Sequence, residues 1–293
     1  MITINIDPII FQIGPVAVRW YGLMYVVGFM VGMWAAGLYA PIRRLTDDDL
    51  WYVFWPSVIA GLLGARLYYV LQSLDKADYL REPWRVFATW EGGMAFYGAV
   101  FAVVPTIYFA ARRRGIDFWS VWDAAAIFAV VGQAFGRVGN IINGDIVGFR
   151  TDLPWGFVYV NPNSFVPLSS ADPMACVRGV PCQPAALYEL LFNLVLFLLM
   201  WRMRYTLKKP GSMFVFWLVG YSLGQLLLFT VRANEELFLG LKQAQLTAIV
   251  VIIACIPLAW YLSRRRNPEP AAMPVEPAER GDDATPDAPA GAG

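Results

Sequence analysis

The segment that decides the fold runs from Gly132 to Gly148 and reads Gly-Gln-Ala-Phe-Gly-Arg-Val-Gly-Asn-Ile-Ile-Asn-Gly-Asp-Ile-Val-Gly. It closes an apolar run of membrane-helix character, yet it carries several polar side chains. At about 100° per residue, Gln133, Arg137 and Asn140 share one helix face, and three glycines share the neighbouring face. Polar groups at membrane depth are costly unless they face a bundle interior or a wet cavity, so this face is a functional-site hypothesis. The alternative is that Arg137 extends its charge to lipid phosphates and the glycines only allow close packing.

The composition of the chain requires a bilayer as solvent. Of its 293 residues 58% are apolar and 15% are charged, and the mean hydropathy is +0.50. These values are far from those of soluble domains and indicate an all-α integral membrane protein. The chain contains no histidine, which excludes histidine-dependent triads, histidine metal sites and a histidine general base. We expect no metal, no cofactor and no nucleic-acid partner.

Apolar runs long enough to cross a bilayer recur along the chain. They predict seven transmembrane helices, at Val18–Ala40, Trp51–Leu71, Gly92–Ala111, Val121–Asn140, Ala185–Trp201, Met213–Phe229 and Ala244–Leu262. Residues 1–17 alternate apolar and polar and predict an interfacial N-terminal arm before a membrane domain at 18–266. Residues 144–184 are polar and predict a small extracytoplasmic head. Residues 267–293 almost lack bulky apolar side chains and predict a disordered cytoplasmic tail.

Basic residues are distributed unevenly between the two sets of predicted loops. One set is rich in arginine and lysine, at Arg43, Arg44, Arg112, Arg113, Arg114, Arg202, Arg204, Lys208, Lys209, Arg264, Arg265 and Arg266. The positive-inside bias therefore places the N-terminus outside and the C-terminus in the cytoplasm. Cys176 and Cys182 share the head loop and could pair if that loop faces an oxidising compartment, and the sequence leaves the pairing open.

Polar residues recur in the outer halves of several predicted spans. Together they describe an electropositive cavity that opens outward and suits a lipid phosphate, because arginine donors match phosphate oxygens bidentately. These residues are Arg66, Tyr97, Arg137, Asn140, Tyr188, Glu189, Gln225 and Arg232. Simpler interpretations stay open: Arg66 can snorkel, Tyr188 can belong to an aromatic belt, and Arg232 ends a span, where arginine needs no special role. We expect Asp123 to favour the N-terminus of its own helix.

Residues 136–148 also follow the pattern Gly-Arg-x-Gly-Asn-x-x-Asn-Gly-[Glu/Asp]-x-x-Gly, which is long and highly specific. This pattern resembles the signature of the bacterial prolipoprotein diacylglyceryl transferases. Further segments that match the family cover almost the whole chain before the predicted tail: Arg19–Tyr25, Gly64–Arg66, Trp90–Phe96, Pro154–Gly156 and Leu187–Glu189.

The resemblance implies an enzyme of the bacterial plasma (inner) membrane. Such an enzyme moves the diacylglyceryl group of phosphatidylglycerol to the lipobox cysteine of a prolipoprotein signal peptide, forms a thioether and releases glycerol 1-phosphate. The implied partners are phosphatidylglycerol, prolipoprotein signal peptides with a lipobox cysteine, and membrane lipid.

The resemblance also implies roles for individual residues. Arg137 and Asn140 would hold the phosphate, and Asp145 would position the loop or accept a proton. Tyr97 completes the catalytic set. The other substrate-binding residues would be Arg66 as supporting charge, Tyr25 near the lipid head group, and Asn143, Gly148, Tyr188, Glu189, Gln225 and Arg232.

The chain departs from the family pattern at several positions. Tyr97 stands where the family has histidine after Gly-Gly-Met-x-Phe, and a tyrosine is a poor base at pH 7. Gln225 and Phe229 replace the arginine and glutamate of Tyr-x-x-x-Arg-x-x-x-Glu-x-x-Arg. Gln183 replaces a histidine, and Asp145 replaces a glutamate. A second hypothesis is therefore a weak or inactive relative that binds phospholipid or lipoprotein precursor. A seven-span transporter is disfavoured, because the sequence has no internal repeat.

Overall fold

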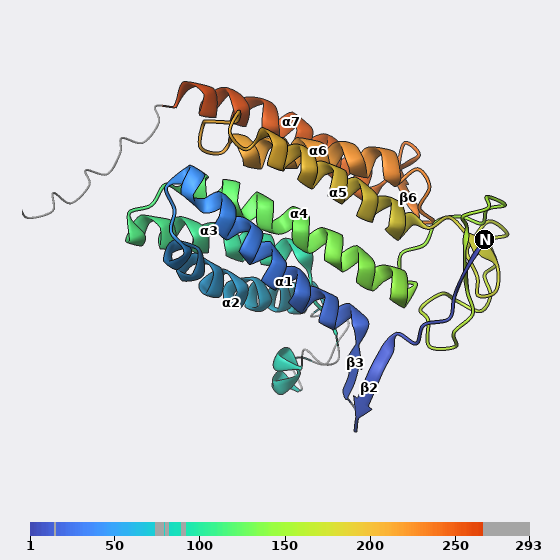
Figure 1. The fold of residues 1–293 in the computed structure, drawn as a ribbon. Coiled ribbons are helices and arrows are strands. Elements are labelled where there is room, and N and C mark those ends of the chain that lie inside the picture. The colour runs from blue at the N-terminus through green and yellow to red at the C-terminus, as the bar shows by residue number, and fades with distance from the viewer. Residues whose placement is uncertain (15, 74–78, 80–81, 89–91, 266–293) are drawn as a thin grey trace, which may run out of the picture.

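The computed structural model describes residues 1–14, 16–73, 79, 82–88 and 92–265. Long helices run side by side and form one bundle (Figure 1). They are α1 (Trp20–Tyr39), α2 (Asp47–Gln72), α3 (Phe96–Arg114), α4 (Phe118–Asn143), α5 (Ala185–Met203), α6 (Ser212–Leu228) and α7 (Gln243–Arg264). The 3-10 helices η1 (Ala40–Arg43) and η2 (Pro83–Phe87) follow α1 and precede α3. The predicted tail at 267–293, and Trp90 and Glu91 of the family pattern, lie outside the described residues.

Five of the described helices are long and apolar enough to cross a membrane: α1 continued through η1, α2, α4, α5 and α7. The α6 helix is apolar but has only 17 residues. The α3 helix has 19 residues and ends in three arginines. By length and composition the protein is therefore a mostly helical, multi-pass membrane protein, whereas the number of seven spans stays a prediction.

The α2 helix begins before its predicted start at Trp51, because its N-terminus is capped. The Thr46 hydroxyl accepts a hydrogen bond from the Asp49 backbone nitrogen at 3.2 Å, and the Asp49 carboxylate accepts one from the Thr46 nitrogen at 3.0 Å. The first turn also carries Asp47 and Asp48, whose negative charges suit a helix N-terminus. These signals extend the helix into the polar sequence before the apolar run.

The α3 helix begins after its predicted start at Gly92, because the backbone at two glycines is not helical. Gly92 and Gly93 have φ angles of +83° and +81°, which lie outside the helical region. A Cβ at Gly93 would lie 2.3 Å from the ring of Tyr69. The chain therefore turns at these residues, and the helix starts only at Phe96.

Glycines let α1 and α4 pack closely. A Cβ at Gly139 would lie 3.0 Å from Cα of Tyr21, and one at Gly28 would lie 2.9 Å from Cβ of Phe135. Because no side chain fits between these backbones, the start of α1 lies directly against the end of α4. Gly132 and Gly136 differ, since nothing lies within 4 Å of a Cβ built at either residue. The predicted glycine face of α4 is therefore used for packing only in part.

A buried ion pair fixes the end of the bundle at which α4 and α6 begin. Arg43 Nε lies 2.5 Å from Asp123 Oδ2, and neither side chain is more than 3% exposed. Asp123 also accepts hydrogen bonds from the backbone nitrogens of Gly211 at 2.9 Å and Phe214 at 2.8 Å. The prediction that Asp123 favours its own helix N-terminus is wrong: Asp123 stabilises the start of α6, and Asp117 caps α4.

A small β-sheet connects the predicted N-terminal arm to the predicted head. One sheet has the order β1 (Ile2–Ile4), β4 (Phe157–Tyr159) and β5 (Pro181–Cys182), and β1 runs parallel to β4. The first residues of the chain therefore pair with the polar segment 144–184. The remaining strands form hairpins: β2 (Ile9–Ile13) with β3 (Val16–Arg19), and β6 (Glu236–Phe238) with β7 (Leu241–Lys242).

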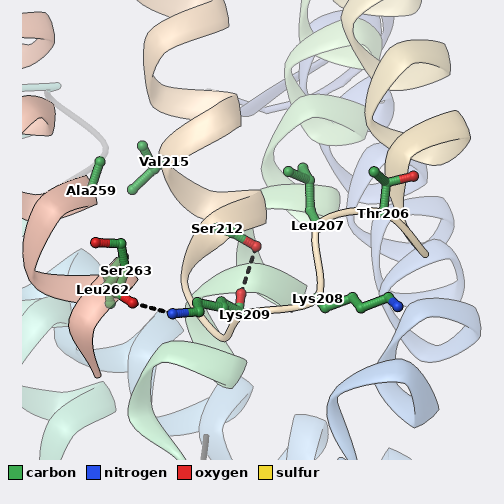
Figure 2. A pocket seen from close by; sticks show the side chains of 9 residues that line it. All are labelled: Thr206, Leu207, Lys208, Lys209, Ser212, Val215, Ala259, Leu262 and Ser263. Carbon is green, nitrogen blue, oxygen red and sulfur yellow. Dashed lines mark hydrogen bonds between the residues drawn. The ribbon is translucent and has the colours of Figure 1, made fainter. Parts of the chain in front are cut away.

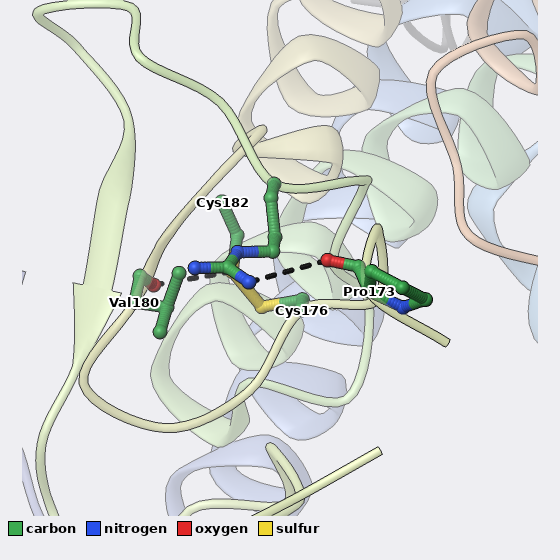
Figure 3. The surroundings of a disulfide bond; sticks show 5 residues. Pro173, Cys176, Val180 and Cys182 are labelled. Atoms are coloured by element: carbon green, nitrogen blue, oxygen red, sulfur yellow. Dashed lines mark hydrogen bonds between the residues drawn. A yellow bond between two sulfur atoms is a disulfide. The ribbon is translucent and has the colours of Figure 1, made fainter. Parts of the chain in front are cut away.

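A disulfide bond links Cys176 and Cys182 within the polar segment (Figure 3). Both cysteines are buried in a small apolar core of that segment. Arg150 lies beside the bond, because its backbone pairs with Cys182 and its guanidinium donates to the Pro173 carbonyl at 3.2 Å. The pairing that the sequence left open is thus present.

A pocket of about 300 Å³ lies where the α5–α6 loop meets α7 (Figure 2). Its lining includes Lys209, whose Nζ donates to the Ser263 carbonyl, and Ser212, whose hydroxyl donates to the Lys209 carbonyl. This is the end of the bundle that holds Asp123, opposite to the end at which the Gly132–Gly148 segment finishes. The pocket is therefore separate from the candidate site.

Candidate active site

A glycine turn at the end of α4 brings Asp145 back over the helix. Gly144 has a φ of +73°, and a Cβ there would lie 3.0 Å from the ring of Tyr159, so both conformation and space require glycine. The Asp145 carboxylate accepts hydrogen bonds from Asn140 Nδ2 at 3.0 and 3.1 Å. Burial raises the pKa of the Asp145 carboxyl above its usual value, although the bonds from Asn140 oppose this.

The guanidinium of Arg137 lies at the centre of the polar cluster. Its Nη1 donates to Asn140 Oδ1 at 2.9 Å, and its Nη2 lies 2.6 Å from Glu189 Oε2. Asn140 therefore binds Arg137 through its oxygen and Asp145 through its nitrogen. The predicted polar face of α4 thus carries the Arg137 cation, and the Asn140 amide links this cation to the Asp145 carboxylate.

Glu189, from the start of α5, stands between two arginines. Its Oε1 lies 3.2 Å from Arg232 Nη1, and its side chain is only 2% exposed. The Arg232 guanidinium lies over the ring of Phe229, 4.3 Å from the ring centre. Burial lowers the pKa of Arg232 from its usual value and Glu189 opposes this, but a guanidinium stays charged. Two cations therefore share one buried anion.

Tyr221 is a member of this cluster that the sequence analysis did not assign to the site. It lies on α6 against the Arg137 guanidinium and within electrostatic range of Glu189 and Arg232. The signal was present in the sequence, because Tyr221 and Gln225 are four residues apart and share a helix face.

Tyr25 lies one contact away from the cluster. Its hydroxyl forms a 2.9 Å hydrogen bond with that of Tyr21, and Tyr21 lies within electrostatic range of Asp145 and Arg137. A mostly apolar cavity of about 630 Å³ adjoins Tyr21, between α1 and the β2–β3 hairpin. Tyr25 itself does not line this cavity, so its predicted place near a lipid head group stays a prediction.

Gly148 closes the signature segment beside Arg232. A Cβ there would lie 2.4 Å from the Val231 oxygen and 2.6 Å from Cβ of Gln183, and its nitrogen donates to the Gln183 carbonyl at 2.9 Å. The Tyr188 hydroxyl donates to Gln183 Oε1 and accepts from Trp155 Nε1, each at 2.8 Å. These bonds hold the polar segment against the start of α5.

Asn143 and Gln225 are buried close to the ends of α4 and α6. Asn143 is 4% exposed, its carbonyl accepts from the Phe165 nitrogen at 2.9 Å, and its Oδ1 has no hydrogen-bond partner among the described residues. Gln225 is 9% exposed. Within residues 92–265 no hydrogen bond joins either side chain to Arg137, so their predicted role in substrate binding stays a prediction.

Arg66 and Tyr97 are not joined to this cluster. Arg66 is 6% exposed, and its guanidinium donates to the backbone carbonyls of Arg85 at 2.6 Å, Val86 at 2.8 Å, Gly92 at 2.6 Å and Gly93 at 2.9 Å. The Tyr97 hydroxyl lies 3.4 Å from Thr247 Oγ1 on α7. In the described part of the chain no ion pair or hydrogen bond joins either residue to Arg137, so their predicted roles stay predictions.

Comparison with known proteins identifies the group to which this arrangement belongs. The family model described as prolipoprotein diacylglyceryl transferase matches residues 8–261. Three relatives carry the name phosphatidylglycerol–prolipoprotein diacylglyceryl transferase. The one from Solidesulfovibrio magneticus is 34% identical over 272 residues, which are 88% of this chain and 94% of the relative. Those from Legionella pneumophila and Bordetella bronchiseptica are each 34% identical, over 266 and 273 residues, with 87% and 89% of this chain and 97% of each relative covered. The chain therefore belongs to the prolipoprotein diacylglyceryl transferase family.

Proposed function

We propose that this protein transfers the diacylglyceryl group of phosphatidylglycerol to the lipobox cysteine of prolipoprotein signal peptides, the first step of lipoprotein maturation. The observation that carries the proposal is the placement of Arg137 and Arg232 around Glu189, at the end of the signature segment. Its partners are phosphatidylglycerol, the signal peptide and the surrounding membrane lipid.

The reaction is a displacement at carbon. The substrate thiolate attacks the glyceryl carbon that bears the phosphate oxygen, the sulfur–carbon bond forms, and the carbon–oxygen bond breaks with its electron pair on the phosphate. The thiol proton passes to Asp145 and then to the released glycerol 1-phosphate, so charge and atoms balance. A carboxyl whose pKa is raised above its usual value accepts a thiol proton more readily than an ordinary carboxyl does.

The arginines stabilise the leaving group in this scheme. Charge develops on the phosphate as the bond breaks, and fixed guanidinium donors stabilise it most effectively in a site that excludes water. Arg137 Nε and Arg232 Nε are both buried without a hydrogen-bond partner among the described residues. In this scheme a lipid phosphate that enters the cluster accepts from these unpaired donors, while Glu189 holds the other ends of both guanidiniums. The same positive charge favours the thiolate form of a nearby cysteine.

We infer seven membrane crossings, with the N-terminus outside and the C-terminus in the cytoplasm of the bacterial plasma (inner) membrane. Pairing of β1 with β4 requires both strands to lie on one side of the membrane, so the chain between them crosses an even number of times. The α1, α2 and α4 helices suit crossing by length and composition, and α3 then supplies the fourth crossing. The disulfide in the polar segment suits an oxidising outer compartment.

Purified protein, phosphatidylglycerol and a synthetic lipobox peptide test the proposal. We expect mass spectrometry to detect the diacylglyceryl thioether of the peptide together with glycerol phosphate. An active relative assayed in parallel is the control. Absence of product in this protein alone contradicts transfer and favours the second candidate, a relative that binds phospholipid with little turnover. The replacements at Tyr97, Gln225 and Phe229 are the observation behind that candidate.

A further inference from the structure

Lys242 is buried beside the site and has no part in the chemistry above. Lys242 is only 5% exposed. A lysine is rarely buried to this extent unless its ammonium has partners. Lys242 is the N-cap residue of α7, where the positive end of the helix dipole disfavours a cation. A role in stabilising the N-terminus of α7 therefore does not explain a lysine at this position.

The partners of Lys242 lie at the end of α6. Its Nζ donates to the Phe229 carbonyl at 2.7 Å and to the Arg232 carbonyl. Phe229 is the C-cap residue of α6, where carbonyl groups lack helical donors and a cation is favourable. Gln245 adds a second link, because its Nε2 donates to the Leu226 carbonyl at 3.0 Å. The start of α7 is thus bound to the end of α6 by two side chains.

The same turn is held from the other side by the signature loop. The Phe149 nitrogen donates to the Val231 carbonyl at 3.2 Å, and Gly148 pairs with the backbone of Arg232. The Lys242 ammonium lies 5.1 Å from the centre of the Phe149 ring. It therefore sits between the loop that ends the signature and the turn that carries Arg232.

We propose that Lys242 is a positioning residue for the transfer reaction, because its bonds to the Phe229 and Arg232 carbonyls fix the direction in which the Arg232 guanidinium meets Glu189 and the lipid phosphate. The inference rests on the proposed function, in which Arg232 binds that phosphate. Without the ammonium, two buried carbonyls lose their side-chain donor and the turn from Phe229 to Arg232 is free to shift.

Three substitutions test this role. Lys242→Met removes the charge at similar length, Lys242→Arg retains it, and Lys208→Met is a matched control on an exposed lysine at the other end of the bundle. Loss of a hydrogen bond from a charged group changes an equilibrium or rate constant on the order of ten- to a hundredfold. We therefore expect kcat/KM for phosphatidylglycerol to fall by about that factor in Lys242→Met. Lys242→Arg should recover most of the loss, and Lys208→Met should match the wild type.

A double substitution separates positioning from general stability. If Lys242 acts through Arg232, adding Lys242→Met to Arg232→Gln should lower kcat/KM by less than about twofold beyond the loss in Arg232→Gln alone. Fully additive losses, or a wild-type rate in Lys242→Met, overturn the inference. If Lys242→Met does not fold, Lys242→Gln takes its place in the same comparison.

The wild-type assay keeps this test distinct from that of the proposed function. A wild type without thioether product contradicts transfer itself. Positioning of Arg232 is then read from the rise in unfolding temperature when phosphatidylglycerol micelles are added. A smaller rise in Lys242→Met than in the wild type and in Lys208→Met supports the inference, and an equal rise in all three overturns it.

Discussion

Glu189 Oε2 lies 2.6 Å from Arg137 Nη2, and these two residues join the start of α5 to the end of α4. Glu189 is only 2% exposed, and a carboxylate so deeply buried is costly unless cations balance it. Arg232 supplies the second cation at 3.2 Å. Glu189 thus sets the positions of both arginines, and its substitution affects them together.

Glu189→Gln should lower the stability of the protein and increase its response to lipid. Removal of one partner of a buried ion pair costs about 3–5 kcal/mol, because the remaining charges are left uncompensated. A bound phosphate can then replace the lost anion, so phosphatidylglycerol should raise the unfolding temperature of this variant more than that of the wild type. Thermal unfolding in detergent with and without lipid measures both effects. Glu235→Gln, on an exposed residue, is the control, and a Glu189 variant with wild-type stability contradicts the prediction.

Arg137→Ala should abolish transfer and leave the protein folded in detergent. Loss of a donor to developing charge by itself lowers rates by about a hundred- to a thousandfold, and Arg137→Ala also removes the charge that binds the phosphate. Arg137→Lys should recover only part of the rate, since an ammonium cannot reproduce the paired donors that reach Asn140 and Glu189. Thioether formation and size-exclusion elution are the measurements. Retained activity in Arg137→Ala removes this residue from the site.

Asp145→Asn separates proton transfer from loop positioning through its pH dependence. The folded-state pKa of Asp145 is raised, so the neutral carboxyl favours folding, and this stability is lost as the pH rises through the folded-state value. Asp145→Asn should therefore unfold no lower than the wild type at pH 7. Its transfer rate should fall and lose its acidic limb if the carboxylate accepts the thiol proton. The exposed Asp152→Asn is the control, and an unchanged pH–rate profile in Asp145→Asn leaves only positioning.

Tyr97→Phe should have a mild effect. The Tyr97 residue is 41% exposed, and its hydroxyl contacts Thr247 at 3.4 Å, a long hydrogen bond at best. We expect a transfer rate within about twofold of the wild type, since the bond at risk is weak and solvent-accessible. Complete loss of thioether formation, with unchanged elution and unfolding temperature, would instead give the hydroxyl a chemical role.

Local sequence predicted the α4 part of the site. The spacing of Arg137 and Asn140 is that of neighbours on one helix face, and the two side chains are hydrogen-bonded at 2.9 Å. The left-handed turn at Gly144, which brings Asp145 back to Asn140, was not predicted from the sequence. Arg137 and Asn140 lie within one helical turn, so the helical period is enough to predict their contact, whereas a turn that follows the helix lies outside that period.

Relationships between distant helices were beyond such reasoning. Glu189 was predicted as a substrate-binding residue, but its place between Arg137 and Arg232 depends on how α4, α5 and the end of α6 meet. Arg66 shows the same limit. The sequence predicted Arg66 as a cation in an outward cavity. In the structure its guanidinium donates to backbone carbonyls of the segment before α3. Every residue type has a backbone carbonyl, so the sequence cannot reveal such acceptors.

The pairing of β1 with β4 has a consequence for biosynthesis. Ile2–Ile4 are synthesised before Phe157–Tyr159, and the four helices α1 to α4 lie between them in the sequence. The β1 strand therefore stays unpaired until those helices and β4 have been synthesised, so this small sheet closes late in assembly.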